Sequence, residues 1–443
     1  MSSSIADAVP PPPSLPAHDV IYENAEMLVV NKPPDVPMDG DLRVYPFTVE
    51  SMVHEHMRKR GIYDDEHERL QQEGKRKKQL KFVHQLDYST SGVLCLAFIK
   101  DTAARLAHCF EMRTTRKYYV ALLHGHVPAT TITQAPTDAD LSKEEVTSIR
   151  QRQTDPFQEW TAQCQSVWRD LGSVRADACS GFSAEKNEKA LGEFHFLLSS
   201  SSAGGSDGAA AGQDEAHTPT VHRHHGTSYY RNTTSRDAVV HDATVYQLIA
   251  EASTASSGCS LTVDLPIGYD GTDPEHFRMA VTTEQGRPAS TSLLVLKQGY
   301  MNKPLASSSP ADTREPVTLV LLSPHTGRRH QLRVHCRAIG FPIVGDKAYC
   351  ADLPWCRPVT PAAHTSIRLQ SPAPRMYLHA WRLLLPGAVT PQISESERVA
   401  LKKKRRRETL NLSERSDAAV SVHRNEWTEF VAPVHFPHVV MDD

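Results

Sequence analysis

The sequence lacks the features that mark membrane-spanning or disulfide-stabilised proteins. Its eight cysteines form no CxxC pair, and Cys350 and Cys356 are spaced too widely for common zinc patterns. The longest apolar runs, such as residues 317–322, are far shorter than the roughly 20 residues that span a bilayer. No apolar core follows the N-terminus. These absences predict an intracellular protein with reduced thiols and no membrane insertion.

The chain also lacks an excess of either charge. It has 49 basic and 52 acidic residues among 443, for a formal net charge of -3. Overall charge therefore does not indicate a nucleic-acid-binding protein, and any binding surface of that kind must be local. The hydrophobic fraction of 39% is enough for one large domain or two ordinary ones.

What is present is a succession of short strand-like and helix-like segments. Strand patterns are followed by turn residues and interspersed with a few amphipathic helices, in the order hairpin 20–34, helix 48–61, strand 92–99, helix 101–112, strand 116–127, strands 259–268, 291–300 and 317–324, helix 329–340 and strand 376–386. This order does not follow a strict alternation of strand and helix, which argues against a doubly wound parallel sheet. We expect an α+β fold with a mixed, mainly antiparallel central sheet flanked by helices and interrupted by a long insertion.

Composition divides the rest of the chain. Residues 1–18 are proline-rich and are expected to form a disordered leader, while 129–258 are expected to be a low-complexity, partly disordered insertion. Residues 387–443 have the composition of a polar, basic C-terminal tail. The catalytic domain is then expected to comprise 19–128 and 259–386. The insertion contains histidines without an ordered partner in the sequence, which argues against a metal site, at positions 217, 222, 224 and 225.

Three polar motifs interrupt the apolar elements, at residues 31–40, 84–92 and 325–335. Each lies where a strand ends or a helix begins, which is where sites are built on rigid scaffolds. The second motif, HQLDYSTSG, contains the single carboxylate Asp87. From its residues alone, Asp87 is either a cap for the backbone of the following Ser-Thr-Ser run or a functional carboxylate.

The third motif concentrates arginines on a short segment. If a helix begins near Arg329, then Arg329, Arg333 and Arg337 form one stripe, opposite Leu332, Cys336 and Ile339. Such a stripe is either a solvated helix face or a clamp for phosphate or carboxylate. One of its arginines is in a position to meet Asp87.

Taken together and in order, these motifs resemble the RluA-type family of RNA pseudouridine synthases. The family signature H-R-L-D-x-x-T-S-G-L-L is similar to HQLDYSTSGVL at 84–94, and the K-x-Y-x-A strand is similar to KYYVA at 117–121. The other matching segments are VVNKPPDVPMDG, LTVDLPIG, GRPASTSLLVL, TGRRHQLRVHCRAIGFPIVGDKAYC and LHAWRL. The similarity departs from the family pattern at Asp35, where a glycine is usual, and at Gln85, where an arginine is usual.

The resemblance implies a set of site residues. Asp87 would be the catalytic aspartate, Arg333 the arginine that pairs with it and favours its charged form, and Tyr119, rather than Tyr118, the active-site tyrosine. Substrate contacts are expected from Lys32, His84, Gln85, Thr90, Ser91, Arg328, His330 and Gln331. Because the arginine usual at position 85 is thought to help extrude the target base, Gln85 is expected to affect substrate affinity or choice.

The resemblance also implies an activity, the isomerisation of uridine to pseudouridine in a structured RNA, with ribosomal and transfer RNA as the expected substrates. The reaction needs no external donor, so no cofactor and no metal are expected, and RNA is the expected partner of a monomer. Asp87 would act either as a nucleophile or as the base that removes the ribose 2′ proton. Two alternatives are a glycosylase-like enzyme that releases the base to water and a catalytically weak or inactive RNA-binding protein.

Two basic runs lie outside these motifs. The run at 74–78 lies just before Asp87 and favours RNA contact, whereas the run at 402–407 favours nuclear import or is an ordinary solvated segment. A nuclear or cytoplasmic location is expected, and a mitochondrial one is not excluded, although the N-terminus has no arginine-rich amphipathic pattern.

Overall fold

The computed structural model describes eleven segments and four single residues of the chain. The segments are 13–16, 19–61, 80–127, 220–226, 239–254, 260–282, 285–302, 314–350, 375–386, 426–437 and 439–441, together with residues 66, 69, 73 and 373. The basic runs at 74–78 and 402–407 and most of the expected insertion lie outside them.

The N-terminal part of the chain folds as its sequence predicts. Strands β1 (Val20–Glu23) and β2 (Met27–Lys32) form an antiparallel hairpin. Helix α1 (Val49–Lys59) begins after Thr48, whose hydroxyl accepts a hydrogen bond from the Ser51 backbone amide in a capping box. Its apolar residues pack with β2 and β4 in one hydrophobic cluster. The predicted hairpin and helix are therefore confirmed.

A single mixed, mainly antiparallel sheet organises the described residues. Its main strand order is β1-β2-β4-β13-β5-β12-β11-β16, with β3, β6, β8 and β14 paired to members of this path. Only the β13–β4 and β14–β6 pairs are parallel. The strands concerned are β3 (Lys81–Phe82), β4 (Ser91–Ala97), β5 (Arg116–His124), β6 (Thr220–His225), β8 (Ser260–Asp264), β11 (Ser290–Asn302), β12 (Arg314–Pro324), β13 (Leu378–Pro386), β14 (Glu426–Val431) and β16 (Val439–Met441). The expected fold class is confirmed.

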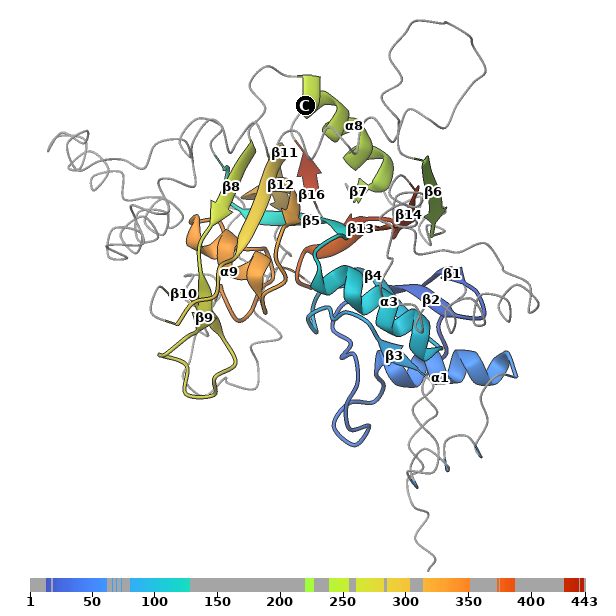
Figure 1. Cartoon of the computed structure of the whole chain (residues 1–443). Helices are drawn as coiled ribbons and strands as arrows, with labels where there is room; N and C mark the ends of the chain where they lie inside the picture. Colours follow the sequence, from blue (N-terminus) through green and yellow to red (C-terminus); the bar gives the residue numbers. More distant parts are fainter. Residues whose placement is uncertain are drawn as a thin grey trace, which may run out of the picture.

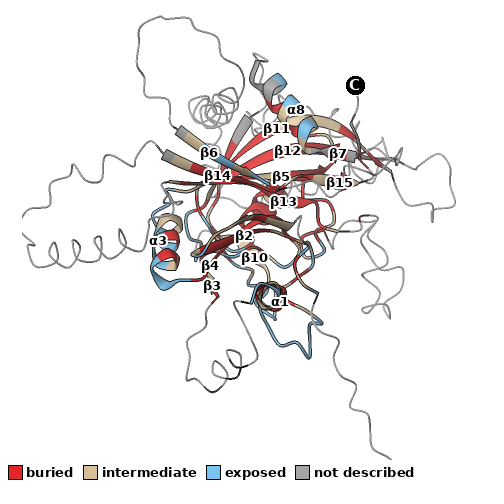
Figure 2. Ribbon diagram, turned by 90° about the vertical axis from the view of Figure 1, so that its right-hand side faces the viewer, coloured by how far each residue is buried: buried red, intermediate tan, exposed pale blue. Residues whose placement is uncertain are grey.

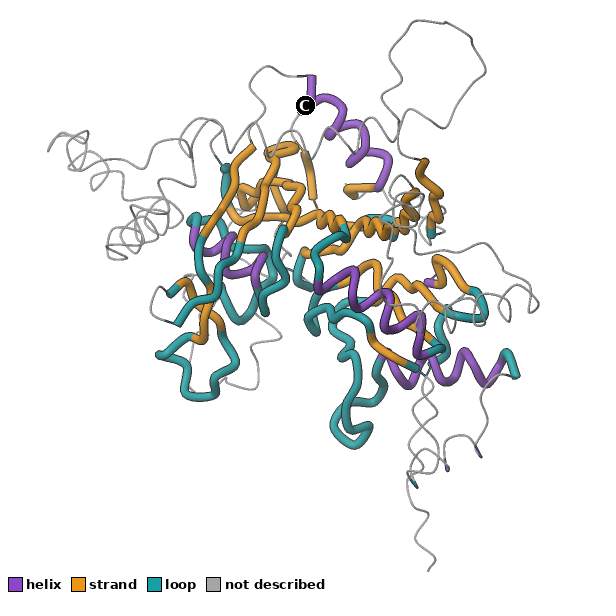
Figure 3. Tube along the Cα trace, viewed as in Figure 1, coloured by secondary structure: helices purple, strands orange, loops and turns teal. Residues whose placement is uncertain are grey.

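Helices cover both faces of this sheet, as Figures 1 and 3 show. Helix α8 (Asp242–Thr254) packs with β11 and β12 in one cluster, and α9 (Gln331–Ala338) packs with the other face of β5 and β12. Helix α3 (Lys100–Glu111) contributes to a further cluster with β4. Figure 2 shows the central strands as almost wholly buried between these layers. Two small ladders pair β9 (Ile267–Tyr269) with β10 (Met279–Val281) and β7 (Val239–His241) with β15 (His435–Pro437).

The sheet extends beyond the catalytic boundaries expected from the sequence. Strand β6 and helix α8 come from residues 129–258, expected to be an insertion, and β14, β15 and β16 come from residues 387–443, expected to be a polar tail. The buried Glu429 of β14 pairs with Arg382 of β13 and Arg223 of β6. Residues 239–254, 426–437 and 439–441 therefore belong to the folded core, because their apolar residues complete a hydrophobic cluster over β5 and β12. Strand β6 joins the same sheet through its parallel pairing with β14. The division of the other residues remains a prediction.

The contact between β4 and β13 leaves no room for a side chain at Gly92. This residue has a φ of +113°, and a Cβ atom there would lie 2.2 Å from the Ala380 carbonyl oxygen. Gly92 also pairs with Lys32, so it joins β2, β4 and β13 just after the Asp87 loop. We expect Gly92→Ala to lower the free energy of unfolding by about 3 kcal/mol or more, because both the backbone conformation and the strand spacing must change.

Denaturant titration followed by circular dichroism would measure this loss. The matched control is Gly271→Ala, since no atom lies within 4 Å of a Cβ atom placed at Gly271. Equal unfolding midpoints for the two variants would contradict the assigned role of Gly92.

No helix among the described residues is long and apolar enough to cross a membrane.

Candidate active site

Asp87 lies in the loop between β3 and β4, and the fold holds the backbone of that loop rigidly. The Thr90 amide donates a hydrogen bond to the Asp87 carbonyl at 3.1 Å. The ammonium of Lys32 donates to the carbonyl oxygens of Tyr88 and Thr90, both at 2.9 Å, and of Pro33 at 3.0 Å. These bonds match the three donors of an ammonium and fix the loop that presents Asp87.

Lys32 therefore positions the loop and does not face the substrate. Its side chain is completely buried and does not line the cavity that contains Asp87. Burial lowers the pKa of Lys32 to about 7, against the opposing influence of Asp35 and Asp87. The expected substrate contact at Lys32 is corrected, because all three donors are used on backbone carbonyls.

Arg333 of α9 joins Asp87 to a second carboxylate. Its Nε and NH2 atoms donate to the two oxygens of Asp346 at 2.7 Å each, and NH1 donates to Asp87 Oδ2 at 3.2 Å. Burial lowers the pKa of Arg333, but the charges of Asp346 and Asp87 outweigh it and raise that pKa above its usual value. The guanidinium thus stays charged and is oriented by Asp346 while it contacts Asp87.

The contact with Arg333 bears on the two interpretations of Asp87. Within the described residues, the Asp87 carboxylate has no hydrogen bond to the backbone of the following Ser-Thr-Ser run, and its partner is Arg333. The side chain is 28% exposed, so it remains accessible from the cavity. The geometry favours a functional carboxylate over a turn cap.

The predicted arginine stripe is corrected at its first member. Helix α9 begins at Gln331, after His330 with a φ of 56°, so Arg329 precedes the helix. Its guanidinium instead lies over the ring of Phe277, with 5.3 Å between Cζ and the ring centroid. Of the residues expected opposite the stripe, Leu332 and Cys336 are buried, and Ile339, at the C-terminal end of the helix, is partly buried against the same cluster.

Tyr119, and not its neighbour, faces the same cavity. Because successive side chains of a strand point to opposite faces, Tyr118 is buried in the cluster beneath α8 while Tyr119 lines the cavity. Burial, with a smaller contribution from Asp87, raises the pKa of Tyr119 well above its usual range. Its hydroxyl is therefore protonated at neutral pH.

His330 is held in one protonation state by its contacts. Its Nδ1 atom lies 2.9 Å from the Tyr349 hydroxyl, which accepts a hydrogen bond from the Met279 amide at 2.8 Å. This hydrogen bond fixes the orientation of the imidazole ring. Burial and the charge of Arg333 lower the pKa of His330 to about 4, so the ring is neutral.

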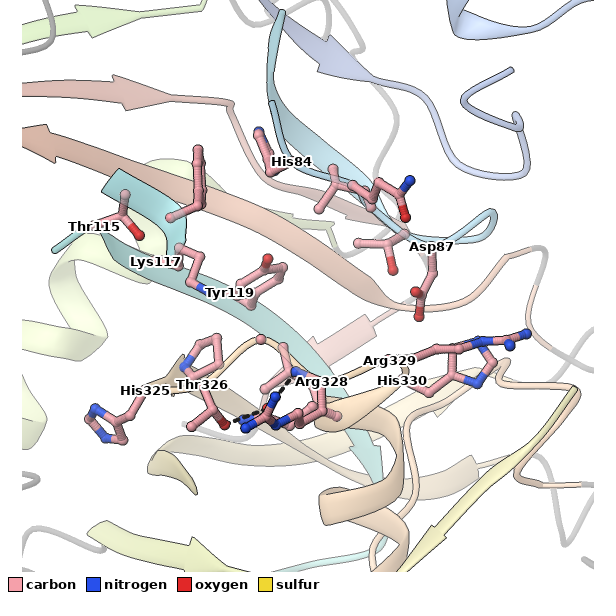
Figure 4. A pocket seen from close by; sticks show the side chains of 18 of the residues that line it. His84, Asp87, Thr115, Lys117, Tyr119, His325, Thr326, Arg328, Arg329 and His330 are labelled. Carbon is pink, nitrogen blue, oxygen red and sulfur yellow. Dashed lines mark hydrogen bonds between the residues drawn. The ribbon is translucent and has the colours of Figure 1, made fainter. Parts of the chain in front are cut away.

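These groups surround a cavity of about 630 Å³. Figure 4 shows Asp87 reaching into it opposite Arg329 and His330, with Tyr119 and Lys117 projecting from β5. The cationic lining residues outnumber the two acidic ones, Asp87 and Glu111, and are Arg113, Lys117, Arg328, Arg329 and Arg333. A cavity lined in this way attracts an anionic ligand.

Two further expected substrate contacts are instead parts of the scaffold. The Gln331 side chain accepts from Thr326 and Arg328 and donates to the Ser290 carbonyl and the Thr291 hydroxyl, which uses its hydrogen-bonding groups. The buried Ser91 hydroxyl contacts His379 and Arg375 and does not line the cavity. Gln331 does line the cavity, but its polar atoms are committed to the loop that carries Arg328.

The remaining expected contacts do line the cavity. Gln85 is exposed at its wall, Thr90 is buried beside Asp87, and Arg328 donates through Nε to the Pro288 carbonyl at 3.0 Å. His84 accepts a hydrogen bond from the Cys95 amide at 2.9 Å and stacks on Phe110. Burial and the charge of Lys117 lower the pKa of His84 to about 3, so it is a neutral side chain.

The sequence reasoning did not single out three residues that the structure places at the site, Asp346, Tyr349 and Lys117. Asp346 and Tyr349 lie within the segment GDKAYC that was matched to the family, so a signal was present. Lys117 precedes Tyr119 in the matched strand motif. Neither pattern reveals that Asp346 accepts hydrogen bonds from two nitrogen atoms of the Arg333 guanidinium.

No cluster of three or more His, Cys, Asp or Glu side chains suited to a metal ion occurs in the described part of the chain.

Comparison with known proteins identifies the family of these residues. A family model described as RNA pseudouridylate synthase matches residues 26–191 and 221–338, which is well over half of the chain. The second matched range contains β6 and α8, in agreement with their place in the folded core.

Individual relatives agree with this match. The chain is 24% identical to the RNA pseudouridylate synthase domain-containing protein 1 of Danio rerio, over 85% of this chain and 72% of that protein. The human protein of the same name is 23% identical over 85% of this chain and 69% of its own length. The dual-specificity RNA pseudouridine synthase RluA of Escherichia coli is 34% identical over 28% of this chain and 42% of its own length. A solved structure of the human protein covers 84% of this chain and 81% of that chain at 21% identity, with a TM-score of 0.38.

Proposed function

The chain belongs to the RNA pseudouridylate synthase family, and from this premise we propose that it isomerises uridine in a structured RNA, ribosomal or transfer, with Asp87 as its catalytic carboxylate. The observation that carries the proposal is the contact of Asp87 with Arg333 at 3.2 Å inside a cavity lined by basic side chains and Tyr119. The contact supports the proposal because one accessible carboxylate then lies among positively charged side chains, which suit an anionic polymer.

The reaction breaks the bond between the ribose and the base nitrogen, turns the uracil and forms a bond from the same ribose carbon to a base carbon. No atom is gained or lost, so the site has to supply a carboxylate, a shaped pocket and proton transfers. Asp87 acts either as a nucleophile or as the base that removes the ribose 2′ proton. Both roles require the charged form of the Asp87 carboxylate, which the positive charge of Arg333 stabilises.

Tyr119 offers the detached uracil a flat surface and a hydroxyl. Because burial raises its pKa above the usual range, the hydroxyl is a hydrogen-bond donor at neutral pH rather than a base. Extruding the base costs a few kcal/mol of stacking in the RNA. Stacking on an aromatic side chain contributes about 1–3 kcal/mol and offsets much of that cost.

A catalytically weak or inactive RNA-binding protein is the alternative, supported by the exposed Gln85 at the cavity wall. A glutamine there lacks the positive charge and the planar fork of an arginine. RNA affinity without product distinguishes this alternative from the proposed enzyme.

The test is incubation of the purified full-length protein with total cellular RNA, followed by digestion and mass spectrometry of the nucleosides. We expect pseudouridine to increase at the expense of uridine. Free uracil with abasic sites would indicate a glycosylase-like reaction instead. If the RNA is taken from cells that lack the protein and its pseudouridine content does not increase during the incubation, the proposal is contradicted.

We also propose that the protein acts as a monomer and that it is located in the nucleus or the cytoplasm. The basic run at 402–407, proposed as a nuclear localisation signal, lies outside the described residues.

A further inference from the structure

Lys117 is a cation at the cavity with no partner among the described residues. It lies on β5 two residues before Tyr119, so the two side chains share one face of the strand and are about 7 Å apart along it. Both line the cavity. Lys117 has no hydrogen bond or ion pair with any described residue.

Its surroundings do not neutralise it. The charge of Arg113 lowers the pKa of Lys117, and the charge of Lys117 in turn lowers the pKa of His84. Arg328 and His325 line the cavity from the facing loop, and Glu111, at the end of α3, is an acidic lining residue. The Lys117 ammonium lies 3.9 Å from the position that a Cβ atom would take at Gly327. In Figure 4 it points into the space between β5 and the loop of His325 and Thr326.

The two ends of the cavity therefore differ in charge balance. Near Asp87, the guanidinium of Arg333 is paired with two carboxylates. Near Lys117, a half-buried ammonium shares the cavity wall with the cations Arg113 and Arg328 and has no ion pair among the residues described. Proteins pair buried charges because an isolated one is costly, so the Lys117 end is suited to an anion brought by the ligand.

We propose that Lys117, together with Arg113 and Arg328, binds a phosphodiester of the nucleotide next to the target uridine. This inference rests on the proposed function, because a polynucleotide at Asp87 carries phosphodiesters as its regularly spaced anions. The spacing along β5 then assigns the target base to Tyr119 and the neighbouring phosphate to Lys117. The absence of a side chain at Gly327 leaves the ammonium open to that phosphate.

The binding is expected to depend on pH. Burial, with a smaller contribution from Arg113, lowers the pKa of Lys117 to about 8, and a bound phosphate favours the charged ammonium. Above that pKa the free protein has lost the proton that the complex needs, so binding must take up a proton. The dissociation constant should then rise up to about tenfold per pH unit above pH 8.

Fluorescence anisotropy with a labelled oligouridylate of about 12 nucleotides tests this with the full-length protein. For Lys117→Met we expect about tenfold weaker binding at pH 7 and a salt dependence of log K that is shallower by about 0.7. Lys117→Arg should bind like the wild type at pH 7 but lose the extra weakening between pH 8 and about pH 9, because arginine stays charged. Lys59→Met is the matched control, since Lys59 is exposed on α1 and does not line the cavity.

A second probe separates phosphate from base recognition. On the same oligomer with neutral methylphosphonate linkages, the difference between the wild type and Lys117→Met should disappear. If it persists, Lys117 contacts the base and the proposal is overturned. It is likewise overturned if Lys117→Met keeps the wild-type affinity and salt slope, or if Lys117→Arg keeps the wild-type pH dependence.

These binding measurements do not require turnover. Pseudouridine formation by the wild type, combined with unaltered binding by Lys117→Met, rejects the phosphate site alone. The expected binding pattern without any pseudouridine rejects the proposed function alone. Circular dichroism of each variant verifies that it is folded.

Discussion

Asp87→Asn is expected to abolish pseudouridine formation while the protein stays folded and keeps its affinity for RNA. The substitution preserves the shape of the side chain, and the amide oxygen can still accept the hydrogen bond from Arg333. It removes the charge on which both the nucleophile and the base mechanisms depend. Nucleoside mass spectrometry after incubation with a substrate RNA measures the loss, and anisotropy measures the retained binding.

The control for this variant is Asp273→Asn, in the loop between β9 and β10. Asp273 accepts backbone hydrogen bonds from Phe277 and Arg278 and does not line the cavity, so its replacement is expected to leave catalysis in place. If Asp87 only capped a turn, asparagine would replace it nearly as well. Wild-type turnover by Asp87→Asn would therefore remove Asp87 from the catalytic machinery.

Arg333→Lys is expected to lower the rate of the chemical step by about a hundredfold or more, with a much smaller effect on RNA binding. An ammonium keeps the charge but cannot reproduce the planar fork that holds Asp346 through two atoms and reaches Asp87 with a third. A displacement of about 1 Å in a catalytic group can cost about 10²-fold in rate. Single-turnover kinetics at saturating protein separates this loss from weaker binding.

Arg337→Lys is the matched control, one helical turn along α9. Arg337 donates to the Tyr349 carbonyl and does not line the cavity, so we expect a rate within about threefold of the wild type. Arg333→Met should in addition lower the free energy of unfolding by about 3–5 kcal/mol, because Asp346 would be left buried without its counter-charge. A fully active Arg333→Lys would show that the geometry of the pair is not needed for the reaction.

The sequence predicted best the features that depend on neighbouring residues. The hairpin of β1 and β2 follows from turn residues between two apolar runs, and α1 follows from its Thr48 cap and helical spacing. The opposite orientations of Tyr118 and Tyr119 follow from the two-residue period of a strand. Asp87, Arg333 and Tyr119 were found because each lies in a short motif that resembles the family pattern.

The sequence was less informative where a residue's function depends on a distant partner. Lys32 was expected to contact substrate, but two of its three donors are taken by carbonyls more than 50 positions away, at Tyr88 and Thr90. In the sequence, residues 426–431 look like part of a polar tail. In the structure they pair with β13, and their Glu429 forms an ion pair with Arg382. Periodicity records which face of an element is apolar, but it does not record which element covers that face.

By itself, then, the sequence determined the α+β class, the individual elements near the N-terminus and the carboxylate, arginine and tyrosine of the candidate site. Only the tertiary structure decided that Asp346 orients Arg333, that Lys32 and Gln331 belong to the scaffold and that Lys117 has no partner in the described part of the chain. The physical reason is the range of the interactions involved. Helix caps and strand alternation act over a few residues, whereas Asp87 and Arg333, separated by 246 positions, meet only when the sheet brings their loops together.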